Sequence, residues 1–196
     1  MASSDSLRRL ALCGVPGAGK STACRLMLDY AMNEGLWARR IRFAEPLYLA
    51  QSLVYSLARR PLGDAVTQDG ALLNFLGAHF RTINSSALLE CFADQESALI
   101  RQFVAQKTQK RGLIVNDDMR YSEEKFLRSR NYTIIKISAP EQLCESRRRR
   151  RGDVLLGTAE HSTERGIRDI RADFTVLNSG TMQHFAKQVI RLVAEL

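Results

Sequence analysis

The apolar positions of this chain fall into short runs that alternate with longer amphipathic runs of helical spacing. The short runs predict strands at residues 7–13, 37–43, 112–116, 132–138 and 174–177. The longer runs predict helices at residues 21–34, 46 to about 60, 71–80, 87–109, 123–130 and 181–196, with one more beginning at Pro140. Strands that alternate with helices are typical of an α/β fold with a mainly parallel sheet.

These elements predict a single domain over residues 1–196, in which helices cover both faces of a five-stranded sheet. The run Leu113–Val115 is apolar throughout, as a strand buried on both faces should be. Residues 151–170 are polar and contain three glycines, so we expect a loop or flap there. No internal repeat or interdomain linker stands out.

The amino-acid composition argues against several classes of protein. The chain has 196 residues, of which 45% are hydrophobic and 26% charged, values that argue against a largely disordered chain. No apolar run approaches the roughly 20 residues that span a bilayer, and the N-terminal apolar stretch is too short for a signal peptide. We therefore expect a cytoplasmic protein with no membrane partner. The four cysteines form no C-x-x-C pair, which argues for reduced, mostly buried thiols.

The formal net charge of +8 comes largely from arginine. Five arginines stand in one run at residues 147–151, so the positive charge is concentrated rather than spread along the chain. Guanidinium groups bind phosphate oxygens in pairs, which suits a protein that handles phosphates. A protein that coats a nucleic acid would usually distribute its charge more widely, so we do not expect a nucleic-acid partner.

The strongest motif follows the first predicted strand. Residues 14–21 read G-V-P-G-A-G-K-S and match the phosphate-loop pattern G-x-x-x-x-G-K-[ST], between a strand and a helix. Glycines let successive backbone N–H groups point at phosphate oxygens, and the following helix adds its positive dipole end. In this pattern the lysine reaches the β- and γ-phosphates and the serine hydroxyl binds Mg²⁺. The predicted Mg-ATP site comprises Gly14, Val15, Pro16, Gly17, Ala18, Gly19, Lys20, Ser21 and Thr22.

An acidic pair ends the third predicted strand. Asp117 and Asp118 follow the buried run, and a carboxylate at such a strand tip can hold Mg²⁺ through water. Successive residues of a strand point to opposite sides, so we expect only one of the two to face the site, and we assign Asp118. The alternative is a solvated pair that caps the next helix.

Four blocks of sequence, in order along the chain, carry a resemblance to a known family. They are the phosphate loop, F-A-E-P-L at 43–47, N-D-D-M-R-Y-S-E-E at 116–124, and H-S-T-E at 161–164 followed by N-S-G at 178–180. In these blocks the chain resembles the bacteriophage deoxynucleoside monophosphate kinases, within the P-loop nucleotide kinases. A looser match, L-G-A-H-F-R at 76–81, has His79 where that family more often has a small or acidic residue.

The resemblance implies transfer of the γ-phosphate of ATP, with Mg²⁺, to the 5′-phosphate of a deoxynucleoside monophosphate (dNMP). Two phosphorylated substrates must meet, so cations must screen their repulsion. The predicted catalytic residues are Lys20, Arg120, Arg147 and Arg151, and Ser21 and Asp118 would hold the metal. The predicted acceptor-binding residues are Arg42, Phe43, Glu45, Tyr48, Arg81, Asp118 and Arg120.

The resemblance also implies two functional regions of the chain. We expect a helical acceptor-binding region at about 44–111 and a mobile, arginine-rich lid at about 141–170. His161 and Glu164 would belong to that lid or to a link that organises Mg²⁺; alternatively, they are a surface histidine and a capping glutamate. The base, the choice of ribose or deoxyribose, and a homodimeric state are not fixed. If a phage encodes the chain, the compartment would be the host cytoplasm.

Two other functions fit the phosphate loop. A P-loop kinase could phosphorylate a modified base or an end within DNA, and the positive lid would then bind a strand. The affinity for such an acceptor would depend strongly on salt. A nucleotide-dependent regulatory module with slow hydrolysis is the third possibility, and measured ATP turnover with and without a dNMP separates it from a kinase.

Overall fold

The computed structural model describes residues 6–62, 68–106, 111–151 and 166–196, apart from the side chains of Arg151 and Arg168. Its five strands form one sheet in the order β2-β3-β1-β4-β5, and every neighbouring pair is parallel. The strands are β1 (Leu7–Cys13), β2 (Trp37–Ile41), β3 (Gly112–Asn116), β4 (Thr133–Ser138) and β5 (Phe174–Leu177). The predicted α/β class and five-stranded sheet are confirmed.

Seven α-helices lie in the described part of the chain. They are α1 (Lys20–Asn33), α2 (Glu45–Leu57), α3 (Gly70–Ile83), α4 (Ala87–Ala105), α5 (Glu124–Ser129), α6 (Glu141–Arg151) and α7 (Met182–Glu195). Short 3₁₀ turns occupy Tyr121–Glu123 and Ile167–Asp169. Most of the predicted loop or flap at 151–170, including His161 and Glu164, lies outside the described residues.

The helix expected at 87–109 ends at Ala105, and two further predicted elements end early for local reasons. The strand expected at 37–43 ends at Ile41, because the next backbone N–H groups, of Phe43 and Ala44, donate to a side chain and not to a neighbouring strand. The helix expected to reach about residue 60 ends at Leu57, because Arg59 adopts a left-handed φ of 56°. A residue in that conformation commonly terminates a helix.

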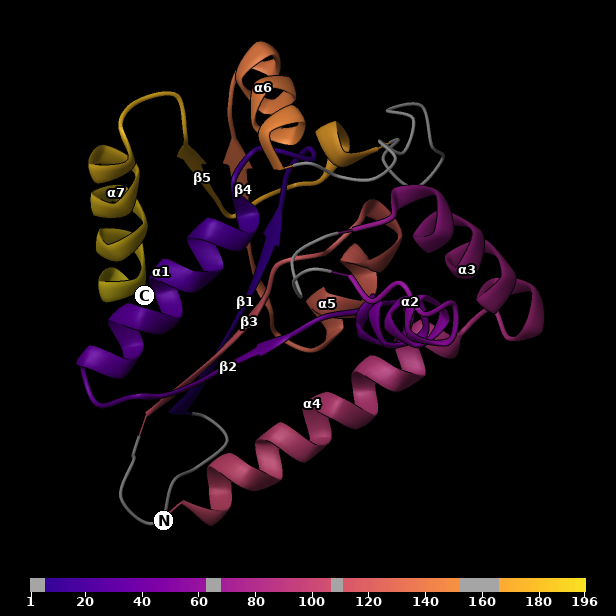
Figure 1. Ribbon diagram of the computed structural model, residues 1–196. Coiled ribbons are helices and arrows are strands. Elements are labelled where there is room, and N and C mark those ends of the chain that lie inside the picture. The colour runs from indigo at the N-terminus through magenta and orange to yellow at the C-terminus, as the bar shows by residue number, and fades with distance from the viewer. Residues whose placement is uncertain (1–5, 63–67, 107–110, 152–165) are drawn as a thin grey trace.

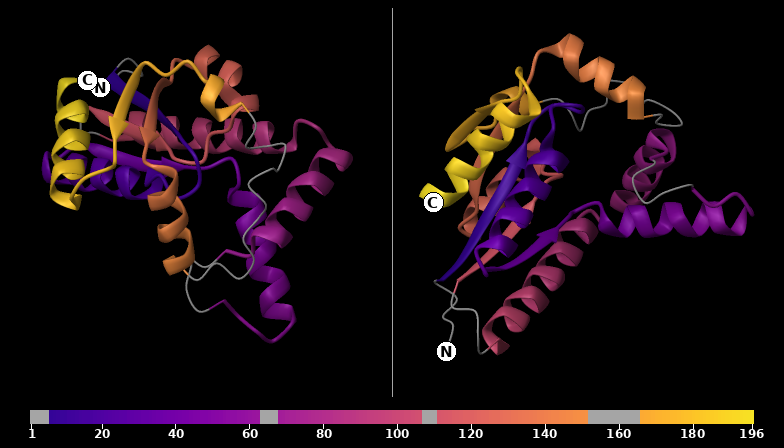
Figure 2. Two further views of the ribbon diagram at one scale, coloured as in Figure 1. Left: turned by 90° about the horizontal axis from the view of Figure 1, so that it is seen from above. Right: turned by 60° about the vertical axis from the view of Figure 1, so that its left-hand side comes forward.

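Strand alternation builds a hydrophobic core on each face of the sheet. Leu10 and Leu12 of β1 pack with buried residues of α1 and α7, whereas Ala11 and Cys13 pack with α4 and α5. Figures 1 and 2 show α1 and α7 together on one side of the strands and α4 on the other. The prediction of helices on both faces is therefore confirmed.

The helices α2 and α3 extend beyond the sheet at the end where β2 leads into α2 (Figure 2). They contact each other, and α3 also contacts α4. The outer face of α2 carries Leu49, Leu53 and Leu57, which are 65%, 60% and 75% exposed. These helices occupy the segment predicted as the acceptor-binding region, whose role remains a prediction.

All four cysteines are free, and Cys13, Cys24 and Cys144 are buried. Burial raises the pKa of Cys24 to about 12 and that of Cys13 to about 11. These thiols therefore stay protonated and weakly reactive at neutral pH. Over the described ranges, no helix combines the length and apolarity needed to cross a membrane.

Candidate phosphate-binding site at the carboxyl edge of the sheet

The phosphate loop connects β1 to α1 at the edge where all five parallel strands end. Gly17 and Gly19 adopt left-handed φ values of 84° and 107°. A Cβ at Gly17 would lie 2.4 Å from the carbonyl oxygen of Cys144, and one at Gly19 would lie 2.3 Å from Nδ2 of Asn178. Both the conformation and the space therefore require glycine at these two positions.

The lysine of the motif lies against the loop itself. Lys20 Nζ donates to the carbonyl oxygen of Gly14 at 2.6 Å and to that of Val15 at 3.3 Å. The ammonium group is thus held where the loop opens into a cavity of about 500 Å³. That size is within the usual range of small-molecule sites.

The structure brings most of the predicted site residues together around this cavity. The lining residues that the sequence predicted are Gly14, Pro16, Gly17, Gly19, Lys20, Ser21, Thr22, Arg42, Tyr48, Asp118, Arg120 and Arg147. The cavity is therefore bordered by the phosphate loop on one side and by residues near the ends of β2 and β3 on another.

Five predicted residues do not line the cavity. Val15 is 36% exposed and Ala18 is fully buried. Phe43 stacks on Phe92 in the core with ring centroids 4.0 Å apart, which leaves only its backbone near the site. The two that remain, Glu45 and Arg81, bind neighbours. The carboxylate of Glu45 binds Arg42 Nε at 2.8 Å, and the guanidinium of Arg81 donates to the carbonyl of Gly77 at 2.9 Å.

The cavity also includes residues that sequence reasoning missed or set aside. They are Arg40, Gln68, Asp117, Met119, Arg148, Ile167 and Met182. The period of two along β2 could have identified Arg40, because it lies two residues before Arg42 on the same side of the strand. The sequence around Gln68 carries no motif that would have identified it.

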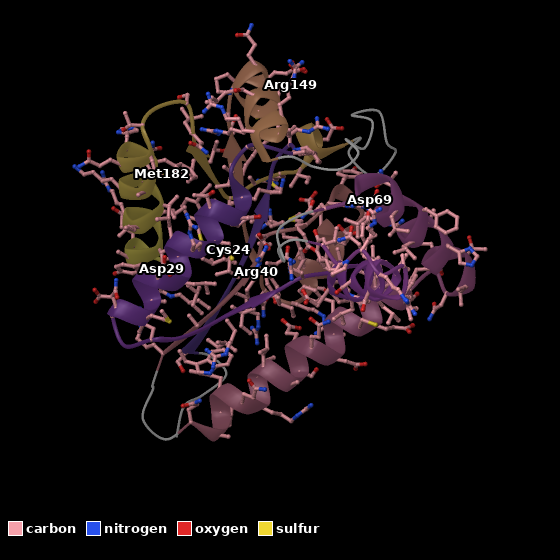
Figure 3. All side chains as sticks on the ribbon, viewed as in Figure 1. Cys24, Asp29, Arg40, Asp69, Arg149 and Met182 are labelled. Carbon is pink, nitrogen blue, oxygen red and sulfur yellow. The ribbon has the colours of Figure 1, made fainter. Side chains whose placement is uncertain are left out.

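Asp117 forms a two-point ion pair with Arg40. Arg40 Nε and NH2 donate to the two carboxylate oxygens at 2.7 Å and 2.6 Å, and the Asp117 side chain is 1% exposed. Burial lowers the pKa of Arg40, but the hydrogen bonds and charge of Asp117 outweigh it and leave the pKa raised. Figure 3 shows Arg40 near the centre of the molecule, close to Cys24 of α1.

Asp118 binds the beginning of α2. Its carboxylate accepts the backbone N–H groups of Phe43 at 3.0 Å and Ala44 at 2.8 Å, and Asn116 Nδ2 at 2.7 Å. Burial raises the pKa of Asp118, although these hydrogen bonds oppose the shift. Both Asp117 and Asp118 line the cavity, whereas we expected one. The strand ends at Asn116, so side-chain alternation no longer separates the pair.

Near the end of β2, the cavity is lined by a cation packed against an aromatic ring. The guanidinium of Arg42 lies 4.6 Å from the ring centroid of Tyr48, a cation–π distance. Gln68 Nε2 donates to the Tyr48 hydroxyl at 3.3 Å. Burial, followed by the charge of Asp118, raises the pKa of Tyr48, so that its hydroxyl stays protonated. Tyr48, predicted as an acceptor-binding residue, therefore lies at the cavity.

The described arginines of the run in α6 do not all face the cavity. Arg147 and Arg148 line the cavity, whereas Arg149 and Arg150 are exposed. Figure 3 shows Arg149 on α6, far from Arg40. The side chain of Arg151, the other predicted catalytic member of the run, lies outside the described part of the structure.

Comparisons with known proteins address the fold. No family model matches the chain, and no curated protein does. Among solved structures, the protein TT1252 from Thermus thermophilus is 16% identical, with a TM-score of 0.52 over 96% of this chain and 98% of that one. This similarity shows a shared fold.

Two weaker similarities are to kinases. A shikimate kinase from Acinetobacter baumannii in complex with shikimate is 16% identical, with a TM-score of 0.47 over 96% of this chain and 94% of that one. The APS kinase CysC of Mycobacterium tuberculosis, in complex with AMPPNP and APS, is also 16% identical, with a TM-score of 0.47 over 96% and 99%. The resemblance to bacteriophage dNMP kinases remains a prediction.

The contacts of Asp118 lead to a prediction about stability. Asp118→Ala leaves the N–H groups of Phe43 and Ala44 without their acceptor, so the free energy of unfolding should fall by about 1–3 kcal/mol. Urea denaturation measures this change. The control Asp94→Ala, at an exposed position of α4, should stay within about 0.5 kcal/mol of the wild type. Equal effects of the two substitutions would show that Asp118 does not hold this turn.

Proposed function

We propose that this chain is an ATP-dependent kinase that transfers the γ-phosphate of Mg-ATP to a dNMP and forms a deoxynucleoside diphosphate. The observation that carries the proposal is the juxtaposition at one cavity of a complete phosphate loop and a second group of cations. A second group of cations beside the phosphate loop would suit a second phosphorylated substrate, whose repulsion from the donor phosphates it would screen.

The donor would bind at the phosphate loop. Its polyphosphate would meet the loop backbone, the N-terminus of α1 and Lys20, the arrangement expected for a P-loop nucleotide site. Arg147 borders the same side of the cavity. These positive groups would stabilise the charge on the phosphoryl group during transfer.

The acceptor would bind against the wall near β2 and α2. Arg42 and Arg120 would receive its phosphate, and the ring of Tyr48 would border its base. The acceptor phosphate already carries an ionised oxygen, so the reaction requires no general base. The chain would instead act by positioning two anions and excluding water.

The Mg²⁺ that accompanies ATP would supply positive charge that offsets the charge of the donor phosphates. In the described part of the chain, no group of three or more His, Cys, Asp or Glu side chains could hold a metal ion. The hydroxyl of Ser21 and the strand-tip carboxylates do border one cavity, which suits an ion bound mainly by substrate oxygens and water. We assign Ser21 as the direct ligand and Asp118 as the ligand through water.

The function is tested by a coupled assay of ADP release against each ribo- and deoxynucleoside monophosphate in turn. We expect ADP release to depend on at least one dNMP, and Lys20→Ala should lower kcat by about 10²- to 10⁴-fold. The exposed α7 variant Lys187→Ala is the matched control and should retain activity. Equal ATP turnover with and without every monophosphate contradicts the proposal, and stimulation by DNA alone favours a DNA kinase.

The metal assignment has its own test. Activity should vanish with EDTA and return with Mg²⁺ or Mn²⁺, and Asp118→Asn should raise the Mg²⁺ concentration needed for half-maximal activity. The Mg²⁺ dependence of ADP binding, measured by calorimetry, provides a readout independent of turnover. Asp117→Asn is the comparison. If it raises the Mg²⁺ requirement and Asp118→Asn does not, our assignment within the pair is wrong.

A further inference from the structure

Asn178, directly after β5, connects three parts of the site. Its side chain is buried, and its Nδ2 donates to the carbonyl of Ala18 in the phosphate loop at 2.8 Å. Its Oδ1 accepts from Arg147 NH2 of α6 at 3.1 Å, and its backbone N–H donates to Ser138 at the end of β4 at 2.7 Å. One residue therefore joins two strand ends through its backbone, and the loop and the arginine-rich helix through its side-chain amide.

The backbone of α6 lies directly against the loop. A Cβ at Gly17 would clash with the carbonyl oxygen of Cys144, which is one helical turn before Arg147. Arg147 NH1 donates back to the carbonyl of Gly17 at 3.4 Å, and its NH2 also donates to the carbonyl of Asn178 at 3.4 Å. The guanidinium of Arg147 is thus held by the loop on one side and by Asn178 on the other.

These contacts give Arg147 a setting that its exposed neighbours in the run do not share. Arg147 is half-buried and borders the cavity with Lys20, whereas Arg149 lies on α6 in contact with solvent (Figure 3). A buried amide that donates at one end and accepts at the other suits this position. The carbonyl of Ala18 requires a donor, and Arg147 requires an acceptor.

We propose that Asn178 is a positioning residue that holds the phosphate loop and Arg147 as one polyphosphate-binding unit. This inference rests on the proposed function in one respect, the binding of a nucleotide polyphosphate at the loop. It does not depend on the identity of the acceptor. Asn178 acts through its two partners, and Arg147 contributes its charge to the bound phosphates.

The central test is the binding of ADP, measured by calorimetry with Mg²⁺. Asn178→Asp keeps an acceptor for Arg147 but places a carboxylate oxygen against the carbonyl of Ala18. We expect ADP to bind about tenfold or more weakly, the loss typical of one well-placed hydrogen bond near a charged group. Gln188→Leu is the matched control, since it removes a side-chain hydrogen bond to Leu177 of the same strand without touching the loop.

A double-mutant cycle separates positioning from a general structural role. Asn178→Leu, Arg147→Gln and the double variant are compared for ADP affinity, for the KM of ATP, and for melting temperature. We expect the effects on ADP affinity to be strongly non-additive, because both side chains act through one set of contacts. If Asn178→Leu does not fold, Asn178→Ala, which also removes the side-chain acceptor for Arg147, replaces it in the cycle.

Two results would overturn the inference. One is a folded Asn178→Asp with ADP affinity within twofold of the wild type, whatever its melting temperature. The other is an additive cycle, which would show that Arg147 and Asn178 act separately. Neither result requires turnover. If no monophosphate accepts a phosphate but the ADP measurements behave as expected, the proposed function fails and this inference stands.

Discussion

Two glycines of the phosphate loop, Gly17 and Gly19, are packed so closely against other elements that neither has room for a Cβ. The carbonyl of Cys144 lies against Gly17, and the amide of Asn178 lies against Gly19. The loop therefore belongs to the rigid edge of the sheet and does not stand apart from it. Lys20, which follows Gly19, and Arg147, one helical turn after Cys144, are placed relative to these contacts.

A parallel sheet explains why so many functional side chains meet there. Residues that follow β1, β3 and β5 converge at the same edge because all strands run in one direction. The two aspartates after β3 then perform different structural tasks. Asp117 fixes the guanidinium of Arg40, and Asp118 fixes the start of α2 through backbone N–H groups. The part of the cavity near β2 and α2 thus depends on the two aspartates that follow β3.

The fold could be predicted where one local pattern decides the structure. The bounds of β1, β3 and β5 match the sequence prediction because mainly apolar runs there are bounded by turn residues. The end of β2 could not be predicted, since it depends on Asp118, 75 residues away from Phe43. The end of α2 depends on the left-handed backbone of Arg59, and an arginine in the sequence does not predict that conformation.

The candidate site likewise contains residues that the sequence identified and contacts that it could not predict. The phosphate loop could be identified from its spacing alone, and Arg42, Tyr48 and Arg120 also border the cavity. The tertiary contacts could not be foreseen. Asn178 reaches Ala18 across 160 residues of sequence, and only the packed sheet brings the two together. Phe43, expected at the substrate, instead fills the core because Phe92 of α4 stacks on it.

The central claim is that phosphate passes to a nucleotide acceptor and not to water. Phosphorus NMR of a reaction containing the protein, Mg-ATP and a dNMP measures this directly. The account predicts that the signals of ADP and of the deoxynucleoside diphosphate appear in equal amounts as ATP and dNMP disappear together. Release of inorganic phosphate with the dNMP signal unchanged would contradict it.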